Sequence, residues 1–365
     1  MTLFFEGKKY RVIKCNHYSE KLSMRAADII LQNSLPLRLH NVSLRELLYL
    51  KSSPCDLFTY DDGSFRKIIK TGSLLGPELI RGLIQKGISK VLTVEKKRDT
   101  IERSIQENLI HATRSLSVGP PLDNGKRLLN LLAQHCSYLY AHPSDDDILS
   151  IHTQSAKILC HFLMKNIDIH PQLYREFMKQ KHKYVLAQPI LSSLFLVGIL
   201  KNSITVGDKE VENLFITSIF KDIGMSTIPI ETYNQKELAP EHISMFKRHA
   251  SESVNILQGR LSLGSNYFTI IENHHCFSHL FKEEISSDFG QNTDEQGEII
   301  ITGFETMVIC ICDIISAMIS ERPYRQASSL FDALGLVKDL VAEHYPQEFK
   351  IIVSYFKQFF KNKSL

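Results

Sequence analysis

The chain has 365 residues, 43% apolar and 23% charged, which is an ordinary globular composition and a length that favours two domains. Its net charge is only +3 with scattered basic residues, so a nucleic-acid polymer is not an expected partner. Seven cysteines without metal-finger spacing favour free thiols in the reducing cytoplasm. The N-terminus lacks a secretory signal, and the longest apolar runs are too short for a transmembrane segment.

The first third of the chain, residues 1–116, has the pattern of a small mixed α/β domain. SPCDLFTYDDGSFRKIIK alternates around an Asp-Asp-Gly turn, as a β-hairpin does. GPELIRGLIQKG then predicts a short helix with Pro77 near its start and Gly87 after its end, and ISKVLTV predicts a strand. We expect a regulatory or interaction role for this domain.

Two prolines and two glycines interrupt the polar run at 117–126, which we predict to be a linker. After it, residues 127–365 repeat apolar side chains at helical spacing, which predicts an all-α domain. The expected helices cover 127–140, 147–165, 189–200, 209–221, 240–257, 306–320 and 328–343, followed by a last amphipathic helix. The predicted fold is therefore α+β overall, with a mixed α/β domain preceding an all-α bundle.

Two aspartates interrupt segments that are otherwise suited to burial. Asp313 lies within MVICICDIISAMI, and Asp222 lies in LFITSIFKDIGM, near the end of a helix that Gly224 is expected to terminate. A buried ionised carboxylate is costly unless it is paired, hydrogen-bonded or bound to a metal. A cap or ion pair and a metal site are the two interpretations of these aspartates.

Three histidines favour the metal interpretation. His249 lies on the predicted helix PEHISMFKRHASESVNIL, and His274 and His275 follow the apolar run YFTIIEN. Imidazole and carboxylate are usual ligands of first-row transition metals. Adjacent side chains on a regular helix point about 100° apart, so His274 and His275 can share one metal only at an irregular turn or a helix end. Separate hydrogen-bonded histidines are the alternative.

The order of motifs from Tyr184 to the C-terminus resembles the HD-GYP branch of the HD phosphohydrolase superfamily, which contains bacterial cyclic di-GMP phosphodiesterases. FITSIFKDIGMSTIP resembles the helix with the His-Asp pair, and MFKRHASESVNIL and IIENHHCFSH resemble the next two histidine motifs. CICDIISAMISERPYRQA resembles the helix that ends in an Arg-Pro-Tyr-Arg turn. The resemblance implies an HD-type helical bundle in a signalling protein.

Three positions depart from the family pattern, which makes the site a degenerate one. Lys221 replaces the histidine of the His-Asp pair, Gln188 stands where another histidine ligand is expected, and Met225 replaces a phosphate-contacting lysine. A protonated amine has no lone pair for a metal, although its charge can neutralise Asp222 and Asp313. The resemblance therefore implies that one metal position is lost.

The remaining ligands imply one divalent transition metal, which can be Fe, Mn or Zn. The resemblance assigns it to a set that comprises Asp222, His249, His274, His275 and Asp313.

The same resemblance assigns substrate binding to Arg322 and Arg325. Any surviving catalysis would use Asp222, with Asp313 orienting a ligand or water and Lys221 stabilising negative charge.

The Gly-Tyr-Pro loop of the family is absent. The chain after His275 runs CFSHLFKEEISSDFGQNTDEQGEII, where six acidic residues stand against one lysine. Such a loop over the site would repel the cyclic di-GMP dianion, whereas a solvated excursion away from the site would not.

These observations favour a binding protein in cyclic di-GMP signalling with little or no phosphodiesterase activity, whose partners are a cyclic dinucleotide and a protein. A metal-dependent phosphohydrolase with a rearranged centre, acting on cyclic di-GMP or another phosphoester, is the alternative. A helical protein-interaction domain unrelated to the family is a third interpretation.

Overall fold

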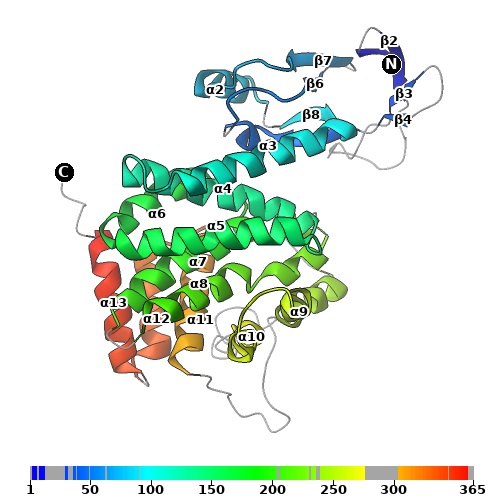
Figure 1. The fold of residues 1–365 in the computed structure, drawn as a ribbon. Helices are drawn as coiled ribbons and strands as arrows, with labels where there is room; N and C mark the ends of the chain where they lie inside the picture. The colour runs from blue at the N-terminus through cyan, green and yellow to red at the C-terminus, as the bar shows by residue number, and fades with distance from the viewer. Residues whose placement is uncertain are drawn as a thin grey trace. The chain divides into compact units, whose positions relative to one another are not determined.

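The structure, a computed structural model, divides into two compact units, Met1–His111 and Ala112–Leu365 (Figure 1). It describes residues 2–5, 8–12, 29–31, 36–37, 39–48, 50–61, 64–88, 90–203, 206–229, 232–235, 239–275, 303–343 and 345–360. The acidic segment after His275 lies outside the described residues, so the two alternatives for its position, over the site or away from it, stay open. Residues 361–365 also lie outside the described residues.

The first unit contains two four-stranded antiparallel sheets, which confirms a small α/β domain. The first sheet has the order β1-β2-β3-β4, with bounds Thr2–Phe5, Lys8–Val12, Ile29–Leu31 and Pro36–Leu37. The second has the order β5-β8-β6-β7, where β5 is Leu39–Ser43, β6 Leu57–Asp61, β7 Ser64–Ile69 and β8 Lys90–Val94. The predicted hairpin is β6–β7, and the predicted strand is β8.

Two helices lie between the strands of the second sheet in the sequence, one after β5 and one after β7. They are α1 (Leu44–Leu47) and α2 (Pro77–Gln85). Pro77 is the first residue of α2, where its missing N–H costs no hydrogen bond. Gly87 follows the helix with a φ of 77°, a conformation that side chains with a Cβ rarely adopt.

In the second unit, the described residues form helices, as predicted. Helix α3 (Glu95–Arg114), which was not predicted, lies mainly in the first unit and crosses into the second. The helices that follow are α4 (Pro121–Ala141), α5 (Asp146–Lys165), α6 (His170–Met178), α7 (Tyr184–Lys201), α8 (Asp208–Phe220), α9 (Pro240–Leu257), α10 (Ser265–Glu272), α11 (Phe304–Ile319), α12 (Leu330–Val341) and α13 (Pro346–Phe360). Three short 3-10 helices join them: η1 (Ile167–Ile169), η2 (Ile223–Thr227) and η3 (Thr232–Asn234).

The predicted linker at 117–126 is partly helical. Pro121 is the first residue of α4, so residues 121–126 belong to that helix. Gly125 marks close packing there, because a Cβ at this position would lie 2.8 Å from the ring of Phe162. In this segment, Pro121 therefore begins a helix and Gly125 permits a tight helix contact, so only residues 117–120 act as a connection.

Helix α7 is the core helix of the bundle. It packs against α4, α5, α8, α11 and α13, and it begins at Tyr184, five residues before the predicted start at Pro189. At Gly198 an added Cβ would lie 2.0 Å from the ring of Tyr355, so glycine permits the approach of α13. The helix is apolar and long enough to cross a membrane, but 83% of it is buried inside the protein.

Candidate metal centre

The segment that follows α8 brings Asp222 against α9. We expected Gly224 to end α8, but α8 ends at Phe220, and Gly224 lies within η2 without a positive φ. Its role is close approach, since an added Cβ would lie 2.0 Å from the carbonyl oxygen of His249. The Gly224 N–H donates to Ser253 Oγ at 2.8 Å, and that hydroxyl donates to the His249 carbonyl at 2.8 Å. These contacts fix η2 on α9.

Three imidazoles converge on Asp222. His249 comes from α9, while His274 and His275 lie in the irregular turn after α10, the setting in which adjacent histidines can share a ligand. The Nε2 atom of His249 lies 3.3 Å from that of His274 and 3.1 Å from that of His275. Asp222 Oδ1 lies 3.1 Å from His274 Nε2 and 3.3 Å from His249 Nε2. The four ligand atoms all lie within 4.8 Å of one another.

The other ring nitrogens show that this cluster suits a cation. His249 Nδ1 donates to the Phe246 carbonyl at 2.5 Å, and His274 Nδ1 donates to the Ile271 carbonyl at 2.6 Å. In a neutral imidazole the remaining Nε2 is then an acceptor. Two lone pairs and a carboxylate oxygen therefore face one another, and a metal ion satisfies all three. Fixing Nδ1 in this way is the usual support of a metal-binding histidine.

Lys221 occupies the opposite side of Asp222. Its side chain is fully buried, and its ammonium forms ion pairs with Asp222 Oδ2 and Asp313 Oδ1. Burial alone would lower the pKa of Lys221, but the two carboxylates outweigh it and raise the pKa above its ordinary value. Burial would raise the pKa of Asp222, but the Lys221 ammonium outweighs it and holds the pKa well below the usual range. Both carboxylates thus have a compensating partner.

Asp313 and Gln188 lie outside the four-atom cluster. Gln188 Nε2 donates to Asp313 Oδ1 at 2.9 Å, and Gln188 Oε1 accepts from Arg322 Nη2 at 2.8 Å. A hydrogen-bonded chain therefore runs from Lys221 through Asp313 and Gln188 to Arg322. In this position Gln188 orients its neighbours.

The Arg-Pro-Tyr-Arg segment forms a tight turn. The backbone N–H of Arg322 donates to the Arg325 carbonyl at 2.9 Å, and the reverse bond is 3.1 Å. Arg325 Nη2 donates to the Ala317 carbonyl near the end of α11 at 2.6 Å, which anchors the turn. The Arg322 guanidinium lies 4.9 Å from the centre of the Tyr184 ring. The Nε atoms of both arginines are buried without a hydrogen-bond partner among the described residues.

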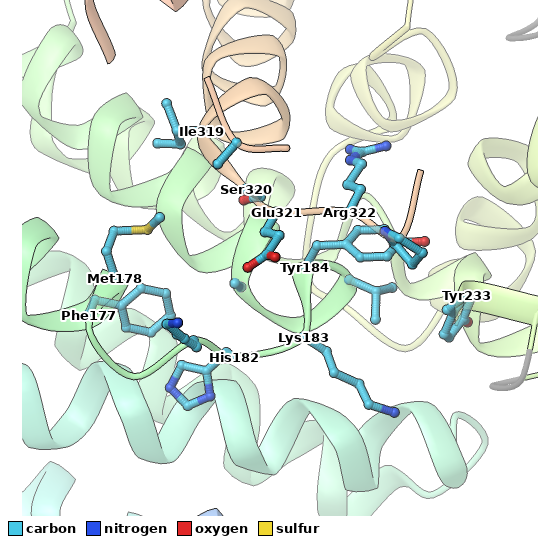
Figure 2. A pocket seen from close by; sticks show the side chains of 15 residues that line it. Phe177, Met178, His182, Lys183, Tyr184, Tyr233, Ile319, Ser320, Glu321 and Arg322 are labelled. Atoms are coloured by element: carbon cyan, nitrogen blue, oxygen red, sulfur yellow. The ribbon is translucent and has the colours of Figure 1, made fainter. Parts of the chain in front are cut away.

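A pocket of about 400 Å³ opens beside this turn. Figure 2 shows Arg322 and Tyr184 with Phe177 and Lys183 around it. Its lining combines aromatic rings with the basic side chains of Lys181, Lys183 and Arg322 and one acidic side chain, Glu321. Positive charge therefore predominates, which suits a ligand that carries both a flat ring and an anionic group.

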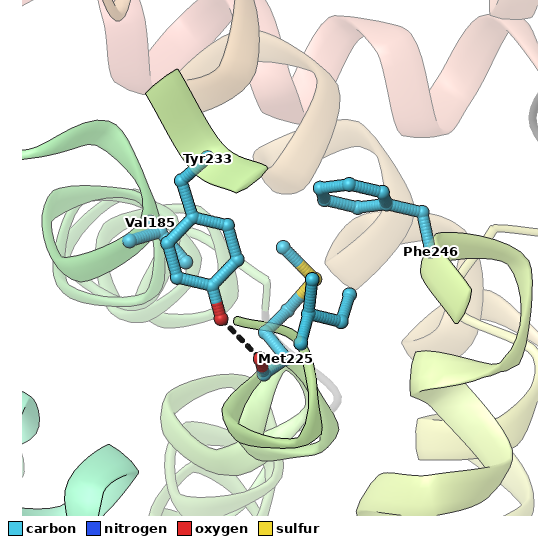
Figure 3. Close-up of a cluster of buried hydrophobic side chains, with 5 residues drawn as sticks. Val185, Met225, Tyr233 and Phe246 are labelled. Carbon is cyan, nitrogen blue, oxygen red and sulfur yellow. Dashed lines mark hydrogen bonds between the residues drawn. The ribbon is translucent and has the colours of Figure 1, made fainter. Parts of the chain in front are cut away.

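Met225 is a core residue. It is 7% exposed and packs with Val185, Ile228, Tyr233 and Phe246 (Figure 3). The Tyr233 hydroxyl donates to the Met225 carbonyl. The thioether therefore helps to hold η2 in place, and it gives a phosphate neither a charge nor a hydrogen-bond donor.

Sequence reasoning missed two residues that support the centre. The Tyr140 hydroxyl donates to the Asp222 carbonyl at 3.1 Å, and Ser253 links Gly224 to α9. Tyr140 is 82 positions away from Asp222 in the sequence, and no local pattern marks either residue. Only the packing of α4 and α9 around η2 reveals them.

The structure is similar to that of Bd1817, described as a HDG"Y"P protein from Bdellovibrio bacteriovorus. The TM-score is 0.59 at 13% sequence identity, and the match covers 87% of this chain and 99% of that chain. At this identity the likeness establishes the fold, which is the HD-GYP fold. No family model and no curated protein matches the sequence.

Proposed function

From the HD-GYP fold and the Asp-His cluster, we propose that this chain is a metal-containing cytoplasmic signalling module. It binds a cyclic dinucleotide or a protein partner and has little or no phosphodiesterase activity. The observation that carries the proposal is the buried Lys221 ammonium between Asp222 and Asp313, which leaves one cluster for a metal.

Asp222, His249, His274 and His275 would hold one Fe, Mn or Zn ion, which supplies Lewis-acid chemistry when bound. Two-metal phosphodiester hydrolysis also needs a clamp on the attacking and leaving oxygens. Lys221 takes the place of a second ion, but its ammonium carries only a single charge and has no open coordination position. This difference is the reason for expecting little turnover.

The pocket beside Arg322 supports binding of a phosphate-bearing ligand. Arg322 lines the pocket, and its guanidinium lies over the Tyr184 ring. Its Nη1 and Nη2 groups donate to Tyr324 and Gln188, so a bound phosphate would replace at least one of these acceptors. Guanidinium groups bind phosphate through paired N–H donors, and aromatic rings stack on bases. A cyclic dinucleotide offers both a phosphate and a base.

Calorimetric titration with cyclic di-GMP, with a hydrolysis assay on the same samples, tests the proposal. We expect wild type to bind without turnover and Arg322→Ala to bind about 10- to 100-fold more weakly, because a charge-assisted bond contributes roughly 1.5–3 kcal/mol. Arg114→Ala, an exposed arginine at the end of α3, is the matched control and should bind as wild type does.

Robust hydrolysis by wild type would contradict the binding role and favour a mononuclear phosphohydrolase. One observation supports that second candidate: the Lys221 ammonium adjoins the cluster, where it could stabilise negative charge in a transition state. An assay with cyclic di-GMP and a generic phosphodiester, on Fe-, Mn- and Zn-loaded protein, separates the two functions. Equal, weak binding by wild type and Arg322→Ala would remove the pocket from the proposal.

A further inference from the structure

We infer that Lys221 limits this centre to one metal ion, and that removing its side chain, which fills the space between two carboxylates, opens a second cation site with oxygen ligands. The inference rests on the proposed metal centre. It goes further by giving a specificity-determining role to a residue that cannot itself bind a metal.

The two oxygens of Asp222 face different partners. Oδ1 faces His274 and His249 at 3.1 and 3.3 Å, while Oδ2 accepts from Lys221 Nζ. The same nitrogen forms an ion pair with Asp313 Oδ1, and the lysine side chain has no exposed surface. One ammonium thus fills the space between the two carboxylates, where a second ion would have to bind.

Charge explains why a cation would replace the ammonium. Asp222 and Asp313 are both buried, and without Lys221 they would share a site with no positive partner between them. An uncompensated buried charge is strongly unfavourable. Gln188 Nε2 also donates to Asp313 Oδ1, so this carboxylate keeps one hydrogen-bond partner when the lysine is removed.

The ligands predict which ion the new site would take. Asp222 Oδ2 and Asp313 Oδ1 are carboxylate oxygens, and water would complete the coordination. Oxygen ligands suit Mn²⁺ and Mg²⁺, whereas the imidazole-rich cluster on the Oδ1 side suits Zn²⁺ and Fe²⁺. The two sites would differ in preference although they share Asp222.

Total metal per chain in Lys221→Ala and Lys221→Met, purified in Mn²⁺ and desalted, tests the inference. We expect about one ion in wild type, about two in Lys221→Ala, and about one in Lys221→Met, because an unbranched side chain of similar length fills the space. Lys221→Ala combined with Asp313→Asn should return to about one, since a carboxylate is lost.

About one ion in both wild type and folded Lys221→Ala would overturn the inference and leave the proposed centre intact. A wild type without metal would overturn both. If Lys221→Ala folds only with metal, soluble yield becomes the measurement: Mn²⁺ in the medium should restore it several-fold, and should not do so for the double variant. Equal yields with and without Mn²⁺ would contradict the inference.

Discussion

Gly224 lies against the backbone of α9, and this contact sets the separation of Asp222 from His249. A methyl group at this position would meet the His249 carbonyl oxygen and the Ser253 nitrogen at 2.0 and 2.6 Å. Both are backbone atoms of a helix, which cannot move aside as a flexible side chain does. The metal cluster therefore depends on a residue that contributes no ligand.

Gly224→Ala should lower the free energy of unfolding by about 1–3 kcal/mol, through overpacking, and should weaken metal binding. Gly335→Ala is the control, because that glycine lies within α12 and an added Cβ there meets nothing within 4 Å. It should raise stability slightly through helix propensity. Urea denaturation measures both, and equal effects of the two variants would disprove the steric explanation.

At the residue scale, the sequence identified the metal cluster from residue type and order. Asp222, Asp313 and the three histidines were predicted as ligands. Asp222 and the histidines lie together, whereas Asp313 lies outside this cluster and forms an ion pair with Lys221. The direction of each ring could not be predicted, since it depends on the Phe246 and Ile271 carbonyls at the ends of two helical turns. The double ion pair of Lys221 likewise follows from tertiary packing, since α8 and α11 both pack on α7, although its neutralising charge was predicted.

Helices α4 and α5 are joined in their interior by a pair of histidines. His135 Nδ1 lies 3.1 Å from His152 Nδ1, and both side chains are buried. One ring must donate and the other accept, so at least the accepting ring is neutral, and the pair cannot form when both rings are protonated. Burial lowers the pKa of His135 to about 4, and burial together with His135 lowers the pKa of His152 well below its ordinary value.

A histidine whose pKa is lowered in the folded state binds a proton more readily in the unfolded state. Its contribution to the free energy of unfolding is therefore fully present above pH 6.5 and is lost as the pH falls toward 4. For His135 the loss between pH 7.5 and 5 is on the order of 2 kcal/mol. Between pH 7.5 and 5, the free energy of unfolding of His135→Gln should fall less than that of wild type, by this amount. Urea unfolding at both pH values measures the difference. His142→Gln, at an exposed position, should keep the wild-type slope. If the free energy of unfolding changed equally with pH in all three proteins, the histidine pair would be excluded as the cause of the acid destabilisation.

At the element scale, helices α5, α8, α9 and α11 lie close to their predicted ranges. The short helix α2 was predicted as well, because Pro77 and Gly87 mark its two ends. No prediction was made for α3, α6 and α10. Of these, α6 and α10 have nine and eight residues, too few to establish a period. The start of α7 was predicted late because Pro189 looked like a first residue, whereas the helix continues through it.

For the whole molecule, the class of each unit followed from its pattern, and the fold of the second unit followed from motif order. The first sheet, β1 to β4, was not predicted, because strands of two to five residues carry little alternation. Pairing between strands distant in sequence, such as β5 with β8, depends on the assembled domain.

If the centre holds a metal, metal binding stabilises the folded chain. A ligand at 100 times its dissociation constant adds about 2.7 kcal/mol to the free energy of unfolding, so a chelator should lower the thermal midpoint by several degrees. His274→Ala, which has lost one ligand, should respond to chelator much less. A midpoint that does not change with chelator in wild type would mean that the bundle is stable without a metal.

The most direct test is elemental analysis of purified wild type and His249→Ala, because His249 Nε2 contacts the ligand atoms of His274, His275 and Asp222. The account predicts about one Fe, Mn or Zn ion per wild-type chain and almost none in the variant, with both proteins folded. Wild type without bound metal, or His249→Ala with a full ion, would contradict it.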